Sequence, residues 1–298
     1  LKDRVAILDV KDTGNCNTDA TNFRNSIGTK GASYGAAYYP YIKSVYDREI
    51  NVYDIYKGLE LSNNELENAQ YYAELSEPTE ESTLFAKQLM SKPEYAKLVA
   101  KIQEQANLLP PSGAIAGIYC ANDNQRGVWH APANMSVSGI SDINVRISDK
   151  QQGELNENTS GKCINAIRAF QGKGILVWGA RTLDGLSSEW KYISVRRFFN
   201  YVEESIQEST AWAVFQPNDA NTWVKVRCQI ENFLSNLWRD GALAGSTPQE
   251  AFYVRVGINQ TMTAQDILNG YMIVEIGMAA VRPAEFIVLQ FSHKLQES

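Results

Sequence analysis

The sequence is poor in the residues on which most catalytic and metal chemistry depends. Among its 298 residues there are two histidines, His130 and His293, which are too far apart in sequence to suggest a His-rich metal site. There are four cysteines and no CxxC pair, so we interpret them as buried thiols in a reducing compartment rather than as metal or redox ligands. These cysteines are Cys16, Cys120, Cys163 and Cys228. We therefore assign no metal site and no cofactor.

The chain also lacks an excess of basic residues and a long apolar run. Lys and Arg number 28 against 34 Asp and Glu, which gives a net charge of −6, and the basic residues are dispersed. This balance argues against nucleic acid as a partner. No apolar run approaches the roughly 20 residues of a membrane span, and no signal peptide is visible. With 44% hydrophobic and 21% charged residues, the composition is that of a globular protein large enough to need no disulfide or metal for stability.

Phosphate and calcium motifs are absent as well. The segments GTK (28–30) and SGKC (160–163) lack the spacing of a phosphate-binding loop, and no aspartates have EF-hand spacing. The glycine-rich stretch 237–257 resembles an active-site loop, but we interpret it as a helix end, a turn and the start of a strand.

The first 50 residues suggest an α/β layer. RVAILDV (4–10) is typical of a strand buried on both faces, and TDATNFRNSI (18–27) of a short helix with Thr18 or Asp19 as its N-cap. YGAAYYPYIKSVY (34–46) predicts a further strand in which Pro40 marks an edge or a bulge. A strand, a helix and a strand in this order indicate a βα unit.

Residues 57–109 predict a helical, acidic insertion at the surface. Its first part is rich in glutamate and has no Lys or Arg, and Pro93 suits the first turn of a later helix with apolar residues at helical spacing. A charge run of this kind is typical of a solvated face.

The second half is expected to be a mixed domain. CINAIRAF (163–170) predicts a short helix that leads into a buried strand, GILVWGARTL (174–183), and we place a domain boundary near residue 165. Apolar residues recur at helical spacing over 190–210 and 218–241, which predicts two long helices. EAFYVRV (250–256), YMIVEIG (271–277) and EFIVLQF (285–291) predict strands.

The one lead toward an enzyme is Asp9, at the end of a predicted buried strand, where subtilisin-like proteases place the acid of their triad. A triad also needs a histidine base and a serine nucleophile. His130 lacks the glycine-flanked helix start expected of a catalytic histidine, His293 lies near the chain end, and no nucleophile segment of the GTSMA type follows. We therefore predict a non-enzyme without catalytic residues.

Nine segments follow one another in a characteristic order between about Tyr34 and Phe291. They are YYPYIK, PPSGAIAGIY, RGVWHAPAN, NAIRAF, GILVWGARTL, WKYISVRRF, WAVFQPND, LWRDGALAG and VRPAEFIVLQF. This order resembles that of contractile tail sheath proteins, a family that includes the sheaths of contractile phage tails, R-type tailocins and extracellular contractile injection systems. One chain contains all nine segments, whereas type VI secretion sheaths are split between two proteins.

The resemblance implies an α/β subtilisin-like domain without a catalytic triad at 1–165, and a smaller sheath C-terminal domain at 166–298 with two long helices on a sheet. It implies a structural subunit that polymerises as stacked rings around an inner tube and contracts to drive the tube through a target envelope. Its partners would be other sheath subunits, the inner tube, and baseplate and terminator proteins, without nucleic acid or membrane insertion. The subunit would be assembled in the bacterial cytoplasm. It would be a component of a phage tail or of a phage tail-like particle that can be released from the cell. A catalytically dead scaffold or binding module with the same fold is the alternative.

Two sets of residues follow as candidates for assembly. The helix at 219–240 is expected to contact the tube through polar residues, although ordinary solvated charges would give the same pattern: Lys225, Arg227, Glu231 and Arg239. The strand at 285–291 has apolar residues on both faces and is expected to complete the sheet of a neighbouring subunit, with 277–284 as a hinge, unless it is a central strand of its own subunit. Its candidate residues are Phe286, Ile287, Val288, Leu289 and Phe291. Because the sequence begins inside a predicted strand without Met, we expect an upstream arm as well.

Overall fold

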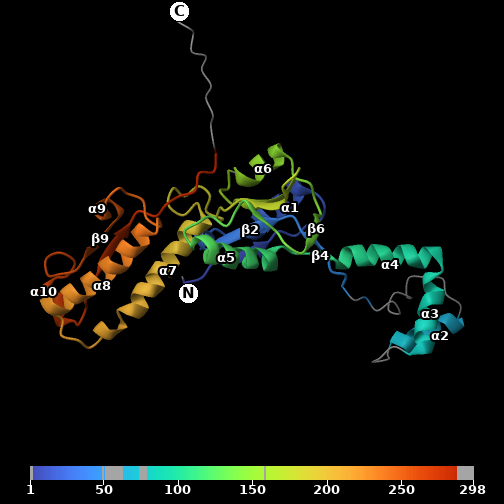
Figure 1. The fold of residues 1–298 in the computed structure, drawn as a ribbon, viewed down its shortest axis with the longest axis horizontal. Coiled ribbons are helices and arrows are strands. Elements are labelled where there is room, and N and C mark those ends of the chain that lie inside the picture. Colours follow the sequence, from blue (N-terminus) through green and yellow to red (C-terminus); the bar gives the residue numbers. More distant parts are fainter. Residues whose placement is uncertain (1–2, 49, 51–62, 74–78, 158, 287–298) are drawn as a thin grey trace, which may run out of the picture.

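A computed structural model describes residues 3–48, 50, 63–73, 79–157 and 159–286 (Figure 1). Its N-terminal unit is built on a five-stranded sheet with the order β1-β2-β7-β8-β5. β1, β2 and β7 are parallel, whereas β8 pairs antiparallel with β7 and with β5. The strands are β1 (Ala6–Asp9), β2 (Gly35–Tyr39), β5 (Met135–Ser136), β7 (Ile164–Phe170) and β8 (Gly174–Trp178).

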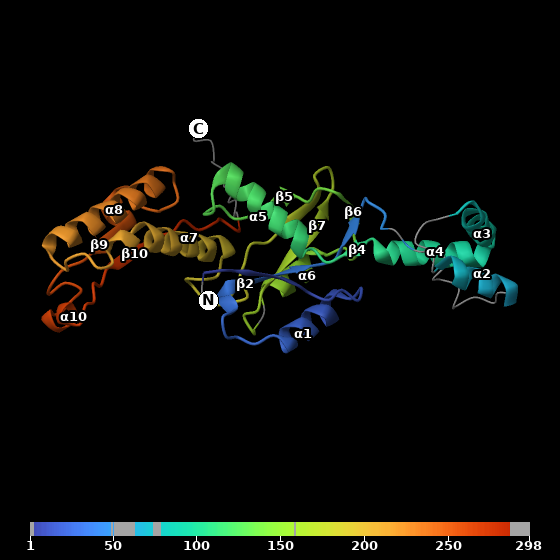
Figure 2. The same cartoon turned by 90° about the horizontal axis from the view of Figure 1, so that it is seen from below.

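Helices cover both faces of this sheet, so the expected α/β layering is confirmed. In β2 the side chains of Ala36 and Tyr38 enter one core and those of Ala37 and Tyr39 the other. Helix α5 lies on one side of the sheet and α1 on the other (Figure 2). The predicted strand at 4–10 forms as β1, but it lies at the sheet edge and is only partly buried. The helices are α1 (Cys16–Ser26), α5 (Ser112–Arg126) and α6 (Asp149–Asn156), with a 3₁₀ turn η1 (Ala32–Tyr34).

The prediction of a short helix at 163–170 is wrong, because this segment forms the strand β7. Ile164 and Ala166 pack into one core and Ile167 into the other, so the strand is apolar on both faces and shows no period-two pattern in sequence. The domain boundary predicted near residue 165 lies inside β7. Because β7 pairs with both β2 and β8, the N-terminal sheet extends to Trp178.

Three local details also differ from expectation. The segment 34–46 forms two strands, β2 and β3 (Ile42–Ser44), in different sheets, and Pro40 lies between them after a cis peptide bond. The N-cap of α1 is Asn15, whose Oδ1 accepts from the backbone N–H of Thr18 at 3.2 Å. Cys16 and Cys163 are buried as predicted, whereas the other two thiols, those of Cys120 and Cys228, are exposed.

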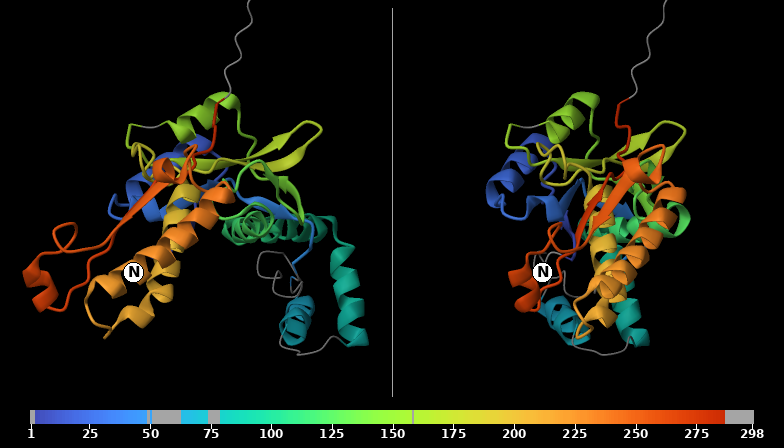
Figure 3. Two further views of the ribbon diagram at one scale, coloured as in Figure 1. Left: turned by 60° about the vertical axis from the view of Figure 1, so that its left-hand side comes forward. Right: turned by 90° about the vertical axis from the view of Figure 1, so that its left-hand side faces the viewer.

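Residues 57–62 and 74–78 of the predicted helical insertion lie outside the described residues; its described part forms an arm of three helices that projects away from the N-terminal unit (Figures 1 and 3). The helices are α2 (Asn63–Ala73), α3 (Glu80–Met90) and α4 (Pro93–Ala106), and Pro93 begins α4 as expected. The arm has its own small core, which contains Ala69, Phe85, Leu89 and Tyr95. At its base β3 pairs with β4 (Leu108–Leu109) and β6 (Ile140–Ile143). Ser44 N–H bonds to the carbonyl of Asn107 at 2.9 Å, so the chain enters and leaves the arm at one point.

The C-terminal unit contains the two predicted long helices, α7 (Ile193–Ser209) and α8 (Ala220–Arg239). They pack on a two-stranded antiparallel sheet of β9 (Phe252–Arg255) and β10 (Glu275–Met278), and β10 begins later than the sequence predicted. Gly241, at φ 84°, adopts the left-handed conformation just past α8, as expected for the stretch at 237–257. The remaining elements are η3 (Ala211–Ala213), α9 (Pro248–Ala251) and α10 (Ala264–Leu268).

Helix α7 joins the two units. The Arg197 guanidinium forms a bidentate ion pair with Asp123 of α5 and lies 4.5 Å from the ring centre of Tyr119. Phe198 packs edge-on to Trp129, with ring centres 6.3 Å apart. The second half of the same helix packs on α8, so one continuous helix belongs to both cores.

Candidate assembly surfaces

Helix α8 begins and ends at well-defined caps. Asp219 accepts from the Thr222 N–H at 3.0 Å, and this backbone bond holds the pKa of Asp219 below its ordinary value. One side of the helix is buried against α7 and β9. The buried residues are Thr222, Val226, Ile230, Leu234 and Leu237. The opposite side faces outward over about five turns, because the apolar positions recur every three or four residues.

The four polar candidates on α8 do not form one group. Arg227 and Glu231 are half-buried and form an i,i+4 pair, with Arg227 Nε 3.9 Å from Glu231 Oε1. Their charges therefore largely offset each other. Lys225 and Arg239 are exposed, and Arg239 donates to Asn236 at 3.1 Å. Among the described residues neither has an acidic partner within 4 Å, so they give the outward face its positive charge.

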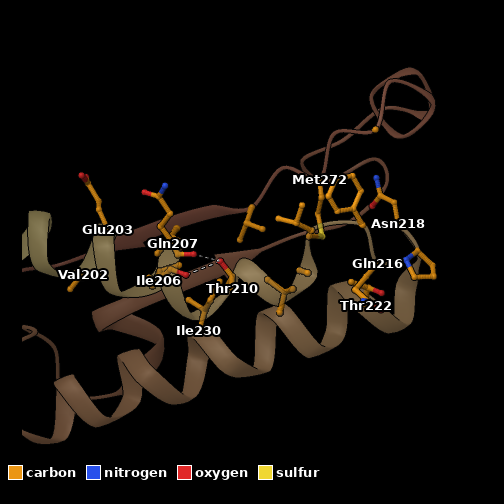
Figure 4. A pocket seen from close by; sticks show the side chains of 18 of the residues that line it. Val202, Glu203, Ile206, Gln207, Thr210, Gln216, Asn218, Thr222, Ile230 and Met272 are labelled. Carbon is orange, nitrogen blue, oxygen red and sulfur yellow. Dashed lines mark hydrogen bonds between the residues drawn. The ribbon is translucent and has the colours of Figure 1, made fainter. Parts of the chain in front are cut away.

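An apolar groove of about 850 Å³ lies between α7, α8 and the segment 272–278, which includes β10 (Figure 4). Met272, Val274, Ile276 and Met278 alternate along that segment and point into the groove. The opposite wall includes Val202 and Ile206 of α7 and Ile230 of α8. The sequence reasoning missed this groove, although the alternation from 272 to 278 is readable in the sequence.

The groove lies beside a strand with room for a further neighbour. β10 pairs with β9, and among the described strands it has no partner on its other side. A strand in that position presents backbone N–H and C=O groups that another extended chain can pair with. The apolar side chains beneath it would meet alternate residues of such a chain.

The loop at the end of the groove exposes further apolar side chains. Phe215, at φ 65°, is fully exposed, and the neighbouring Val214 has 63% of its residue reference area exposed. Both residues line the groove. Tyr271, whose carbonyl accepts from Asn218 Nδ2 at 3.0 Å, is also exposed. Contiguous exposed apolar surface of this kind marks interaction sites.

Most of the predicted C-terminal strand, Ile287, Val288, Leu289 and Phe291, lies outside the described residues. Phe286 is described; it is exposed and belongs to no strand. The preceding Glu285 is held by Arg181 of the N-terminal unit, with Nη2 to Oε2 at 2.7 Å. The position of these strand residues in an assembly therefore remains a prediction.

Of the residues considered for catalysis, the structure describes Asp9 and His130, which lie in different segments of the fold. Asp9 ends β1 and accepts from the backbone N–H of Ser112 at 2.8 Å, so its carboxylate caps the first turn of α5. His130 is exposed in the loop after α5, and His293 lies outside the described residues. In the part of the chain that the structure describes, no cluster of three or more His, Cys, Asp or Glu residues could hold a metal ion. No described helix is long and apolar enough to cross a membrane.

Comparison with known proteins repeatedly finds tail sheath proteins. The family model of the phage tail sheath C-terminal domain matches residues 187–294. The tail sheath protein of Vibrio phage KVP40 is 23% identical over 192 residues, which are 64% of this chain and 27% of the phage protein.

Solved structures match over nearly the whole chain. A chain of the PVC sheath complex, an extracellular contractile injection system in its contracted state, is 33% identical with a TM-score of 0.72. The match covers 97% of this chain and 63% of that one. A chain of the contracted helical sheath of the anti-feeding prophage is 34% identical with a TM-score of 0.67, over 97% of this chain and 61% of that one. This chain thus spans less than two thirds of the length of these relatives, and the comparisons support its place in the contractile tail sheath family.

Proposed function

We propose that this chain is the structural subunit of a contractile sheath. It would polymerise as stacked rings around an inner tube and contract to drive the tube through a target envelope. The observation that carries this proposal is the likeness, over 97% of the chain, to a chain of a contracted sheath complex. Other sheath subunits, the inner tube, and baseplate and terminator proteins would be the partners, and assembly would take place in the bacterial cytoplasm. Contraction then needs no nucleotide, because a metastable extended array gains new contacts when it shortens.

The outward face of α8 is our candidate for the tube contact. Lys225 and Arg239 are exposed cations without acidic partners among the described residues. Exposed ion pairs are weak and are screened beyond roughly 8 Å at physiological salt, which suits a tube that the sheath must release. Charge reversal at Lys225 and Arg239 tests this contact. The matched control is charge reversal at Lys97 and Lys101, which are exposed on helix α4 of the arm.

The groove beside β10 is our candidate for the contact between subunits. The apolar strand predicted at 285–291 would pair with the free side of β10, and one row of its side chains would enter the groove. Met272 is half-exposed in the groove, whereas Leu268 is exposed outside its lining. Met272→Glu is therefore expected to prevent polymerisation and Leu268→Glu to permit it. Normal sheath from the Met272 variant would contradict this assignment.

We further propose that the N-terminal unit is a subtilisin-like domain without catalytic function. Asp9 at the carboxyl end of a parallel strand supports the likeness, and its bond to the N–H of Ser112 gives it a structural role. His130 is exposed on a loop. A serine-hydrolase activity probe is expected to label nothing.

Negative-stain microscopy of the purified particles tests the main proposal. A sheath is expected to give helical tubes of two lengths, long and narrow before contraction, and short and wide after it. A passive scaffold with the same fold would give one length or no tubes.

A further inference from the structure

A strap formed by residues 279–286 runs from the C-terminal unit back to the N-terminal unit (Figure 1). Its first part is tied to the C-terminal unit by backbone bonds. The Ala279 N–H bonds to the Ala251 carbonyl at 2.8 Å, and the Val281 N–H bonds to the Ala242 carbonyl at 3.3 Å. Its last part reaches Arg181, just after β8, through Glu285. The strap therefore connects both units over a few residues.

The contact at the far end is a buried bidentate ion pair. Arg181 Nε donates to Glu285 Oε1 at 2.8 Å, and Nη2 donates to Oε2 at 2.7 Å. The Tyr192 hydroxyl donates to the same carboxylate at 3.2 Å, and Lys191 Nζ lies 4.0 Å away. The Arg181 side chain is 4% exposed and that of Glu285 is 19% exposed. Burial alone would lower the pKa of Arg181, but the bonds to Glu285 raise it above its ordinary value. Paired charges at this burial form strong hydrogen bonds.

The site that receives Glu285 is held by several hydrogen bonds, whereas the strap is not part of a regular element. Asn165 of β7 bonds to both backbone groups of Arg181, at 2.7 and 2.8 Å, and Arg181 Nη1 donates to the Asn156 carbonyl at 2.8 Å. By contrast, the backbone of 282–286 makes no hydrogen bond to another described residue, and Pro283 has no N–H to offer. The end of the strap is thus held through the Glu285 side chain.

We propose that Glu285 and Arg181 form a releasable latch that fixes the point where the C-terminal segment leaves the subunit. With the latch closed, the segment departs at Phe286. With the latch open, it departs at Val281, so five residues, 282 to 286, are added to its reach. At about 3.3 Å per extended residue this adds roughly 17 Å. The idea rests on the proposed function in one respect, since the added length would let neighbours stay joined while rings slide.

Spin-label distances in the isolated full chain test the latch. One label is placed at Phe286→Cys, where the side chain is exposed, and the other on the native exposed thiol of Cys120 in α5. Cys228→Ser removes the second exposed thiol, and Cys16 and Cys163 are protected by burial. With the latch closed we expect one narrow distance distribution. Glu285→Gln, which keeps the shape but removes the charge, should broaden it by up to roughly 17 Å.

Two further variants make the result specific. Glu275→Gln is the matched control. The carboxylate of Glu275, on β10, accepts from the hydroxyl of Tyr253 on β9 at 2.9 Å, but it does not touch the strap. It should leave the distribution narrow. Tyr192→Phe, which removes one bond to Glu285, should broaden it less than Glu285→Gln does. Distributions that stay narrow in both latch variants would overturn the proposal, and so would equal broadening in the Glu275 control. Because the subunit is measured alone, this result is independent of whether the chain forms a sheath.

Discussion

Two truncations that differ by two residues separate a role in assembly from a role in folding. Removal of 287–298 is expected to leave a folded, soluble subunit that cannot form sheath, because the predicted exchange strand is lost. Removal of 285–298 takes Glu285 as well and is expected to destabilise the subunit itself. The strand assignment alone predicts no difference between them, so the difference reports on the contact with Arg181.

The size of that difference follows from the burial of Arg181. Without Glu285, Arg181 keeps its bond to the Asn156 carbonyl but loses the partners of Nε and Nη2. Breaking a buried ion pair by removing one partner costs about 3–5 kcal/mol. We take the lower end, about 3 kcal/mol, because Glu285 is 19% exposed and water can reach the site. The shorter truncation should change the free energy of unfolding by less than about 0.5 kcal/mol, the usual range for a surface change.

Urea unfolding of the full chain and of both truncations, followed by circular dichroism, measures these differences, and electron microscopy measures sheath formation. Equal stability of the two truncations would refute the reasoning about Arg181. A loss of several kcal/mol in the shorter truncation would indicate that 287–291 is a strand of its own subunit. Full-length contractile tubes from the shorter truncation would show that the strand is dispensable.

Three further predictions concern charge, catalysis and pH. Charge reversal at both Lys225 and Arg239 should change the free energy of unfolding by less than about 0.5 kcal/mol, because both side chains are exposed. It should prevent polymerisation of the sheath on the tube, and normal extended particles would contradict the tube assignment. The variants Asp9→Asn and His130→Ala should still assemble into sheath. Ester or peptide hydrolysis by the native chain that disappears in either variant would contradict the non-enzymatic role. Burial, with the nearby Asp19 as a smaller cause, raises the pKa of the Cys16 thiol to about 11. Between about pH 9 and 11 the Cys16 thiol therefore keeps its proton in the folded state and loses it in the unfolded state. The free energy of unfolding should fall as the pH rises over this range, and Cys16→Ala should flatten this part of its pH dependence.

The sequence by itself determined the elements whose signals are local. Helices α7 and α8 were predictable because apolar residues recur every three or four positions, and α8 also lies between clear caps at Asp219 and Gly241. The described helices of the arm were predictable from Pro93 and from the glutamate-rich stretch of the sequence. The likeness to contractile tail sheath proteins was predictable because it rests on the order of many short segments along the chain.

Only the tertiary structure decided features that depend on partners distant in sequence. The strand β7 resembles a helix in sequence because a central strand is apolar on both faces and loses its alternation. The groove forms where α7, α8 and residues 272–278 meet, and each of these alone has an ordinary amphipathic pattern. Arg181 and Glu285 are 104 positions apart, and neither residue type signals a buried partner. Such contacts are set by the packing of whole elements, because a buried charge is stable only where the fold brings its counter-charge.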